Sequence, residues 1–387
     1  MKQLRQFFLL TLVLFLSTFA KNFSQTNSIE IAGNVIDGET GVPIENVAVF
    51  LSFTTFHTKT NSNGEFKLTD VIPGTYAIIC IADSFEQVTQ KIDVTGVVNL
   101  RANFILKKQE STLKNKIVQM VSFIERDKFV EKFKREFLGE GLRTFKCDIV
   151  NPDDIEFTHN GVQLFAKSEK PIIVLNKSLG YKLNIYLNDF KWEWFNDYGS
   201  FSFDAFFENL VASDSLESLR YSANRKEAYR GSFRHFLRAC ASRKIYSEGF
   251  KVFETTYVPN ELGEYEDFKD QVESQRAWQA ARLIESIMKK NGENEFVFET
   301  DLYLEVVYTE NCEEPNYSSY KERIFGTNET YEFQDSWVKF PAGKYIFNER
   351  GIGLENNTYQ KQFFGYWAWK RLGDLLPNDY ESPLNVE

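Results

Sequence analysis

Residues 60–76 read TNSNGEFKLTDVIPGTY, a stretch with a turn signal on either side of one short apolar-polar segment. Asn63-Gly64 is typical of a tight hairpin turn, because both residues tolerate a positive φ angle. Pro73-Gly74 ends the segment with a second turn, and Asp37-Gly38 gives a third turn signal upstream. Turns at such close spacing predict antiparallel β structure, with Asn63-Gly64 at the tip of a hairpin.

Alternating apolar residues extend this pattern outward on both sides. In the last predicted strand, apolar residues share one face while Asn99, Arg101 and Asn103 share the other. A period of two residues is that of a half-buried strand, so residues 28–107 are predicted to form a β-sandwich. The apolar positions are Val47, Val49, Leu51, Phe53, Ile78, Cys80 and, in the last strand, Val98, Leu100, Ala102, Phe104 and Leu106.

The order and spacing of several short motifs carry a resemblance to a known family. Gly33–Asp37 reads GNVID and is followed by Thr40-Gly41-x-Pro43, and then by Thr60–Phe66 and Val71–Tyr76. These pieces resemble the carboxypeptidase regulatory-like domain family. The resemblance implies a seven-stranded Greek-key sandwich of the transthyretin shape. It also implies an accessory module without catalytic residues of its own, in which the glycines and prolines form turns.

The first 25 residues have the pattern of a secretory signal peptide. Lys2 and Arg5 precede an apolar run over residues 7–20, which is too short to span a membrane comfortably. We expect cleavage near Ala20 or Gln25, and export to the periplasm, outer membrane or cell surface. The alternative is a lone N-terminal membrane anchor. Charged residues interrupt every later apolar run, so no further transmembrane segment is expected.

Composition restricts the possible partners. The chain has 387 residues with 45 Lys and Arg against 55 Asp and Glu, a formal net charge of −10. An acidic protein lacks the excess of clustered cations that nucleic-acid phosphates require, so no nucleic-acid partner is expected. Four cysteines are too few for a disulfide scaffold and show no metal-ligand spacing, although one disulfide is possible; they are Cys80, Cys147, Cys240 and Cys312.

The remainder divides into a polar linker at 108–116 and a larger β-rich domain at 117–387. This domain has inserted helices, which is an α+β arrangement, and it resembles no family we know. Together with the sandwich this makes the chain mainly β. Helices are predicted around 129–137, over 215–243 with a break at Gly231-Ser232, over 273–290 and at 372–376. Strands are predicted at 144–157, 162–166 and 181–194, at 200–206 after a turn at 196–199, along one long strand at 296–306, and within 331–347.

The sequence lacks the common catalytic motifs. A zinc carboxypeptidase needs His-x-x-Glu, but the third residue after each of the three histidines is Thr60, Val162 or Arg238. There is also no Gly-x-Ser-x-Gly elbow and no phosphate-binding P-loop. The acidic groups Asp153-Asp154-x-Glu156 and Glu313-Glu314 lack the spacing of a calcium loop and are interpreted as solvated loop charge. We therefore expect no catalytic residues, metal or cofactor.

The most distinctive segment is YRGSFRHFLR at residues 229–238. In one continuous helix, Lys226, Arg230, Arg234 and Arg238 would form a basic stripe beside His235. Arginine forks bind anions in bidentate fashion, which makes Arg230, Arg234, His235 and Arg238 a candidate ligand site. The alternative is that these arginines pair with the chain's own Asp and Glu residues.

Two tryptophan pairs form a second candidate site. Trp192/Trp194 and Trp367/Trp369 have the two-residue spacing that places side chains on one face of a strand. Exposed rings in that arrangement could stack on sugar rings, whereas buried rings would serve packing.

These observations favour a non-enzymatic binding or scaffolding protein of the bacterial envelope, with envelope proteins or glycans as possible partners. A glycan-binding protein with Trp or Tyr platforms is the first alternative. An enzyme with an unfamiliar site near the arginine-rich helix is the second. Exposed Trp pairs would favour glycan binding, a deep polar cleft at Arg234 and His235 would favour catalysis, and buried rings with paired arginines would favour scaffolding.

Overall fold

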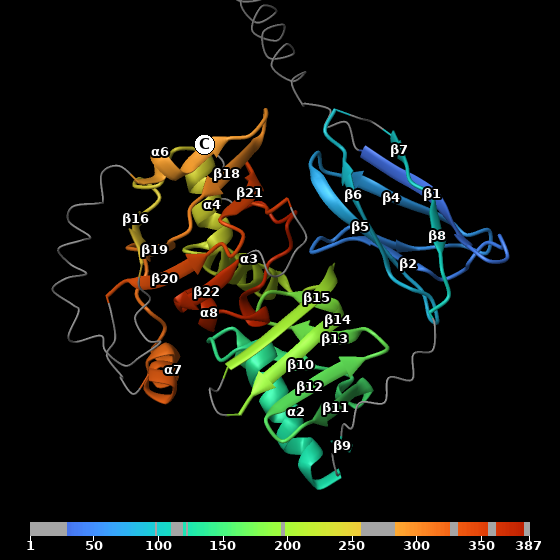
Figure 1. Ribbon diagram of the computed structural model, residues 1–387, viewed down its shortest axis with the longest axis horizontal. Coiled ribbons are helices and arrows are strands. Elements are labelled where there is room, and N and C mark those ends of the chain that lie inside the picture. The colour runs from blue at the N-terminus through green and yellow to red at the C-terminus, as the bar shows by residue number, and fades with distance from the viewer. Residues whose placement is uncertain are drawn as a thin grey trace, which may run out of the picture.

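The computed structural model is mostly β, with 43% strand and 21% helix, as the sequence predicts. Figure 1 shows a β-sandwich beside a larger region that contains further sheets and several helices. The predicted signal peptide and most of the predicted linker lie outside the described residues. The structure describes residues 29–96, 99–109, 119–120, 123–194, 198–256, 283–325, 332–354 and 361–382.

The sandwich consists of two four-stranded sheets packed face to face. Its core is a cluster of buried side chains that includes Ile31, Val49, Phe66 and Phe104. One sheet contains β4 (Glu65–Val71), β1 (Ile29–Asp37), β7 (Asn99–Arg101) and β8 (Phe104–Leu106), and the other contains β3 (His57–Lys59), β2 (Ala48–Leu51), β5 (Thr75–Ile81) and β6 (Val88–Asp93).

Two details of the sandwich differ from the prediction. Asn63-Gly64 is not a hairpin tip, because β3 and β4 belong to opposite sheets and this turn crosses between them. The glycine is still required, since Gly64 has φ 71° and a Cβ there would lie 2.5 Å from the Val35 carbonyl oxygen. The predicted strand at 98–106 is interrupted, and its halves β7 and β8 each pair with β1 in parallel. The predicted alternation holds, since Ala102, Phe104 and Leu106 are buried and their neighbours are exposed.

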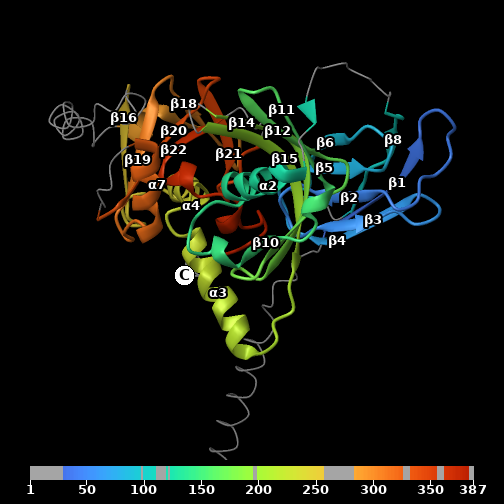
Figure 2. The same ribbon diagram turned by 90° about the horizontal axis from the view of Figure 1, so that it is seen from below.

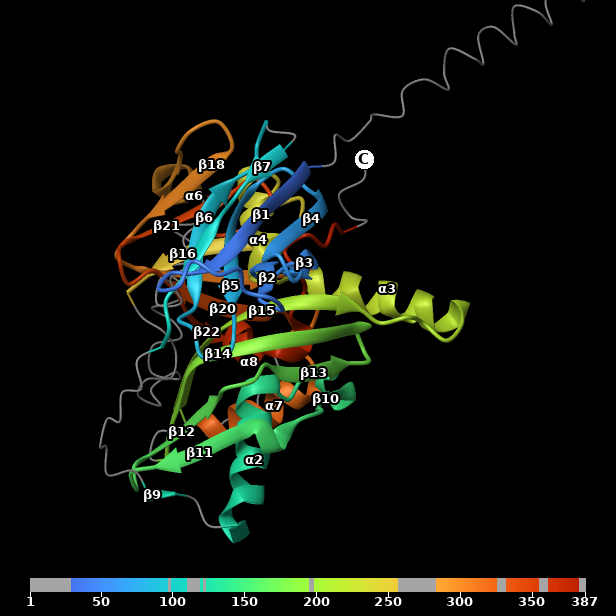
Figure 3. The ribbon, with the colours of Figure 1, turned by 90° about the vertical axis from the view of Figure 1, so that its right-hand side faces the viewer.

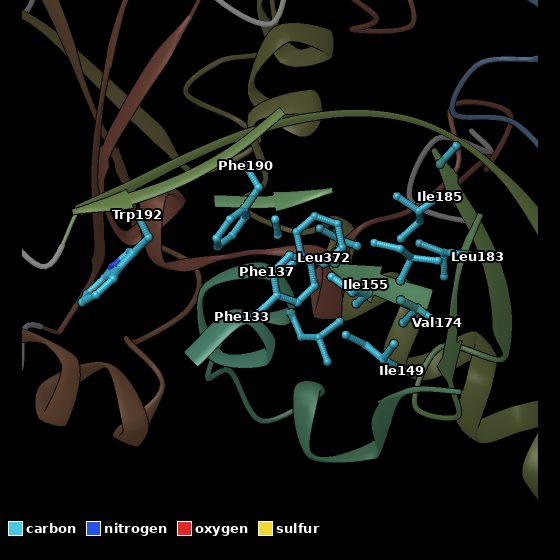
Figure 4. Packing of buried hydrophobic residues seen from close by; sticks show 14 of the residues in the cluster. Phe133, Phe137, Ile149, Ile155, Val174, Leu183, Ile185, Phe190, Trp192 and Leu372 are labelled. Carbon is cyan, nitrogen blue, oxygen red and sulfur yellow. The ribbon is translucent and has the colours of Figure 1, made fainter. Parts of the chain in front are cut away.

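The second region is built on one sheet with a helix across it. Helix α2 (Phe123–Leu138) presents Phe129, Phe133 and Phe137 to the sheet, as its spacing predicts, and Figure 4 shows the last two rings packed beneath Phe190. The sheet order is β10 (Cys147–Ile149), β13 (Ile172–Asn176), β14 (Tyr181–Glu193), β12 (Gln163–Ser168), β11 (Ile155–His159) and β9 (Gln119–Met120), with β15 (Tyr198–Asn209) along the other edge of β14.

The β14–β15 hairpin agrees with the sequence, although its turn residues 195–197 lie outside the described part of the chain. The predicted strand at 144–157 instead begins with the 3-10 turn η1 (Thr144–Lys146), and a second 3-10 turn, η2 (Pro152–Asp154), divides the rest into β10 and β11. Pro152 at the start of η2 explains this division, because proline supplies no N–H to a strand ladder.

The third region has its own core around Phe236, Phe298 and Phe340. Helix α3 projects away from the sheets (Figures 2 and 3), whereas α4 is part of this core. The helices of this part of the chain are α4 (Phe233–Ala241), α6 (Leu283–Ile287), α7 (Pro315–Phe325) and α8 (Tyr366–Trp369). Helix α3 (Ser215–Tyr229) and the 3-10 turn η4 (Leu372–Asp374) instead contribute Ala228 and Leu372 to the core of the second region. One sheet contains β16 (Phe250–Thr255), β19 (Tyr303–Tyr308), β20 (Gln334–Lys339) and β22 (Gln362–Gly365), and the other contains β17 (Met288–Lys290), β18 (Glu295–Glu299) and β21 (Lys344–Asn348).

Three predictions for this region need correction. The long strand expected at 296–306 is two strands, β18 and β19, which enter different sheets because the chain turns at residues 300–302. Of the helix expected at 273–290, residues 283–287 are helical but 288–290 form β17, and the first part lies outside the described residues. The expected terminal helix is shortened to the 3-10 turn η4.

The sandwich is joined to the second region by hydrogen bonds and by a small shared core. The Phe53 N–H donates to the Ala205 carbonyl at 2.7 Å, and the Phe207 N–H donates to the Thr54 carbonyl at 2.8 Å. Beside this contact, Phe50 and Ile79 of the sandwich bury their side chains against Phe206 of β15. The sandwich thus covers the outer edge of β15 around residues 205–207, where backbone groups would otherwise be open to pairing with other chains.

Candidate functional site

The predicted basic stripe is interrupted at the expected place. Helix α3 ends at Tyr229 and α4 begins at Phe233. Gly231 between them has φ 69°, and the Ser232 hydroxyl caps α4 by accepting a hydrogen bond from the His235 N–H at 3.1 Å. Because the helix axis is broken, Arg230 is separated from the Arg234–Arg238 pair.

Arg230 and His235 are engaged within the third region. The Arg230 guanidinium donates to the Tyr308 hydroxyl at 3.3 Å and lies 3.5 Å from a Glu227 oxygen. His235 is buried, its Nδ1 accepts the Gly231 N–H at 3.1 Å, and its Nε2 lies 3.2 Å from a Glu248 oxygen. Burial lowers the pKa of His235 below its usual 6.5, against the opposing effect of Glu248.

Arg234 and Arg238 lie one turn apart on α4 and have different kinds of partner. Arg238 donates to a Glu381 carboxylate oxygen at 2.8 Å. Arg234 donates instead to backbone carbonyls, those of Pro377 and Tyr380 at 2.9 Å each and that of Arg350 at 3.3 Å. Burial lowers the pKa of Arg234 to about 10, so this guanidinium is still charged at neutral pH.

The structure adds Arg350, a residue that the sequence reasoning missed. It follows β21, and it donates through Nε and Nη2 to the other Glu381 oxygen at 3.1 and 2.8 Å. We call Arg234, Arg238 and Arg350 the arginine triad. No signal in the sequence joins Arg350 to α4, because 116 residues separate it from Arg234 and the two meet only after β21 packs beside α4.

Residues 375–382, here called the C-terminal strap, link the triad to the sandwich. The Asn378 N–H donates to the Phe53 carbonyl at 2.6 Å, and Asp379 accepts from the N–H of Thr55 at 2.9 Å and from its hydroxyl. The same strap provides Glu381 and the carbonyls that hold Arg234. The strap therefore connects these arginines to the sandwich, which Arg350 also contacts directly through the Tyr76 hydroxyl at 3.5 Å.

A small polar pocket opens beside the strap. Its volume is about 320 Å³, and Tyr380 and Glu381 form one wall opposite one face of α3. Its lining residues are Asn209, Leu210, Ala212, Ser218, Tyr221, Ser222, Arg225, Tyr380 and Glu381. Arg225 is held in place by the Leu179 and Gly180 carbonyls at 2.7 and 3.0 Å. The pocket borders the triad at Glu381 without including Arg234 or His235.

The two tryptophan pairs do not form exposed platforms. Trp367 and Trp369 are 7% and 1% exposed and lie on α8 rather than on a strand, so the predicted strand geometry is wrong for this pair. Trp192 is 5% exposed, with the Lys132 ammonium 3.4 Å from the centre of its ring. Trp194 alone among the four is solvent-facing, at 37% exposure, and it contacts Trp192 edge to face.

One acidic group is buried, contrary to its interpretation as solvated charge. Glu313 forms an ion pair with Lys321 at 2.7 Å, and both side chains are almost fully buried. Glu314 accepts from Arg143 at 2.8 Å and also pairs with Lys370. These carboxylates are partnered by cations because uncompensated burial of charge is unfavourable. Within the described ranges, no three or more His, Cys, Asp or Glu residues are grouped so as to hold a metal ion.

The four cysteines are free thiols, so the possible disulfide is not formed. In the part of the chain that the structure describes, no helix is both long and apolar enough to cross a membrane.

Comparison with known families agrees with the two-sheet geometry of the N-terminal unit. Residues 31–118 match the CarboxypepD_reg-like domain family. The CarboxypepD_reg-like domain contains the Gly64 turn and the parallel closing strands β7 and β8, and it contributes Phe50 and Ile79 to the contact with β15. The region that follows the domain matches no family. No curated protein matches the sequence.

Several solved structures are similar over a fifth to a quarter of the chain. The 3-chlorocatechol 1,2-dioxygenase from Rhodococcus opacus 1CP is 14% identical over 23% of this chain and 63% of its own, with a TM-score of 0.19. A type II cohesin–X-dockerin complex from Acetivibrio cellulolyticus is 24% identical over 20% of this chain and 52% of its own, with a TM-score of 0.17. The 5-hydroxyisourate hydrolase from Klebsiella pneumoniae is 18% identical over 21% of this chain and 92% of its own, with a TM-score of 0.18. The match spans less than two thirds of the first two of these chains.

Proposed function

We propose that this protein is an exported, non-enzymatic binding or scaffolding protein of the bacterial envelope. Its CarboxypepD_reg-like domain acts as an accessory module that is fixed to a larger binding region. The family is typical of exported bacterial proteins, which supports the envelope assignment. Envelope proteins or glycans are the expected partners.

The observation that carries this proposal is the attachment of the domain to the larger region at two places. Backbone hydrogen bonds join Phe53 and Thr54 to β15, and Phe50 packs against Phe206 in the shared core. The strap adds a second attachment through Asp379 and Thr55. Main-chain pairing combined with apolar burial gives the domain a defined contact with the larger region, which suits a scaffold.

The environment of the candidate residues supports a structural role over a catalytic one. Both ring nitrogens of His235 are engaged by Gly231 and Glu248, so neither is positioned toward a substrate. The pocket beside the strap does not include Arg234 or His235, as a catalytic cleft there would. The glycan-binding alternative loses support, because three of its four candidate rings are buried.

Export and binding can be tested together in cells that produce the full chain. We expect the mature protein in an envelope fraction, with an N-terminus between residues 21 and 27 by mass spectrometry. Cross-linking before extraction is expected to give discrete adducts of the mature form. An intact Met1 in the cytosol would contradict export. A mature envelope protein that never forms an adduct would contradict the binding or scaffolding role.

A further inference from the structure

Glu381 is held in the way that a bound carboxylate ligand is held. Arg238 donates to one of its oxygens at 2.8 Å, and Arg350 donates to the other at 3.1 and 2.8 Å. Two guanidiniums that donate to opposite oxygens of one carboxylate bind it strongly and in a fixed orientation. Burial alone would raise the pKa of Glu381, yet Arg238 and Arg350 hold it below its usual range.

The positive charge of the triad exceeds the negative charge in contact with it. Among the described residues, Glu381 is the one carboxylate that hydrogen-bonds to these three guanidiniums. The nearby carboxylates have other partners, since Asp379 accepts from Thr55 and Glu248 faces His235. Among the described residues, no carboxylate hydrogen-bonds to Arg234, which is held by carbonyl dipoles and interacts with Glu381 only through space.

The backbone of the triad belongs to elements other than the strap, although strap carbonyls accept hydrogen bonds from Arg234 and Arg350. Two of its members lie on α4, and the third lies in a turn that packs directly against α4. Gly351 in this turn has φ 73°, and a Cβ there would lie 2.4 Å from the Arg234 carbonyl oxygen. The Asn348 side chain fixes the turn by accepting from the N–H groups of Arg350 and Ile352, each at 3.0 Å. Helix α4 and the turn after β21 therefore fix the backbone positions of the triad.

The Glu381 side chain is more exposed than the two arginines that bind it. The Glu381 side chain is 49% exposed, against 24% for Arg238 and 13% for Arg350. A carboxylate that is half in solvent can leave without opening the core, and Glu381 also lines the pocket beside the strap.

We propose that the arginine triad is an anion-binding site for carboxylate or phosphate groups, and that Glu381 fills it from within the chain in this structure. An external anion occupies the site by replacing the Glu381 side chain. Both ligand chemistries fit, because guanidinium forks bind the paired oxygens of carboxylates and phosphates in the same geometry. Tethering gives Glu381 a high effective concentration, so polyvalent anions compete best. This site goes beyond the proposed scaffolding role and does not depend on it.

The test compares full-length wild type with Glu381→Gln in thermal melts, with inorganic phosphate or citrate added against sodium chloride at matched ionic strength. Without an anion we expect Glu381→Gln to melt below wild type, because the triad loses its carboxylate. Each anion that binds should then raise the melting temperature of Glu381→Gln by several degrees more than that of wild type. The phosphate and citrate arms show which chemistry is preferred.

Glu299→Gln is the matched control, because it makes the same change in net charge at an exposed pair with Lys289. It should respond to anions like wild type, and Arg350→Ala combined with Glu381→Gln should lose the added response. An equal response of Glu381→Gln and Glu299→Gln would overturn the proposal.

Hydrogen exchange of wild type provides a readout that does not depend on a variant folding. If an anion displaces Glu381, citrate or phosphate should increase amide exchange in residues 375–382 relative to sodium chloride. Unchanged exchange at anion concentrations that saturate the thermal response would also overturn the proposal.

Discussion

At the scale of single residues, the protonation of His235 follows from its two neighbours. The Gly231 N–H donates to Nδ1, so this nitrogen must carry a lone pair. The proton of the neutral ring is then on Nε2, where it points to Glu248 at 3.2 Å. Protonation of Nδ1 would break the hydrogen bond that closes the turn between α3 and α4.

We therefore predict that His235 makes the fold sensitive to acid. Its pKa is lower in the folded protein than the usual 6.5, so the unfolded chain binds the proton first as pH falls. The neutral His235 ring makes its full contribution to stability above about pH 6.5, and this contribution is lost as pH falls further. Its total size is about 1.4 kcal/mol for each unit by which folding lowers the pKa of His235. Urea unfolding of wild type and His235→Asn between pH 7 and 5 measures it. The variant keeps an acceptor for Gly231 but does not titrate, so equal slopes would disprove the prediction.

At the scale of elements, local patterns in the sequence predicted much of the structure. The spacing of Phe129, Phe133 and Phe137 predicted α2, and Gly231-Ser232 predicted the division of α3 from α4. These features depend on neighbours within a few residues. The long strand at 296–306 was predicted wrongly because alternation continues across residues 300–302, while β18 and β19 pair with strands that no local pattern reveals.

The break between α3 and α4 is expected to require glycine for two separate reasons. A positive φ disfavours other residues by about 1–2 kcal/mol. A Cβ on Gly231 would also lie 2.6 Å from the buried Tyr308 ring and 2.7 Å from Gln334, and overpacking costs about 1–3 kcal/mol more. Gly161→Ala is the matched control, since Gly161 has φ 86° with nothing within 4 Å of its Cβ position. Gly231→Ala should lose more free energy of unfolding than Gly161→Ala. Equal losses would mean that packing at the break is not tight.

At the scale of the whole molecule, the contacts between regions were beyond sequence analysis. Phe50 lies on the face of β2 opposite to Val49 and Leu51, which indicates that both faces of this strand are buried, but no local pattern indicates Phe206 as its partner. In the sequence, Glu381 is likewise one of 55 acidic residues, and only the fold places it between Arg238 and Arg350. The candidate site was thus half predicted, since Arg234 and Arg238 came from a helical repeat and their partners came from tertiary packing.

The contact between the sandwich and β15 lies outside the core of the sandwich, so the sandwich is expected to fold by itself. A fragment of residues 28–109 should fold, because its own core includes Phe66 and excludes Phe50. We expect a β-type circular dichroism spectrum and a cooperative melt. In the full chain Phe50 is fully buried against Phe206, so Phe50→Ala should destabilise it by about 3–5 kcal/mol. In the fragment Phe50 lacks this partner, so the same change should cost far less, whereas Phe66→Ala should destabilise both. If Phe50→Ala destabilised the fragment as much as the full chain, Phe50 would belong to the core of the sandwich rather than to the boundary.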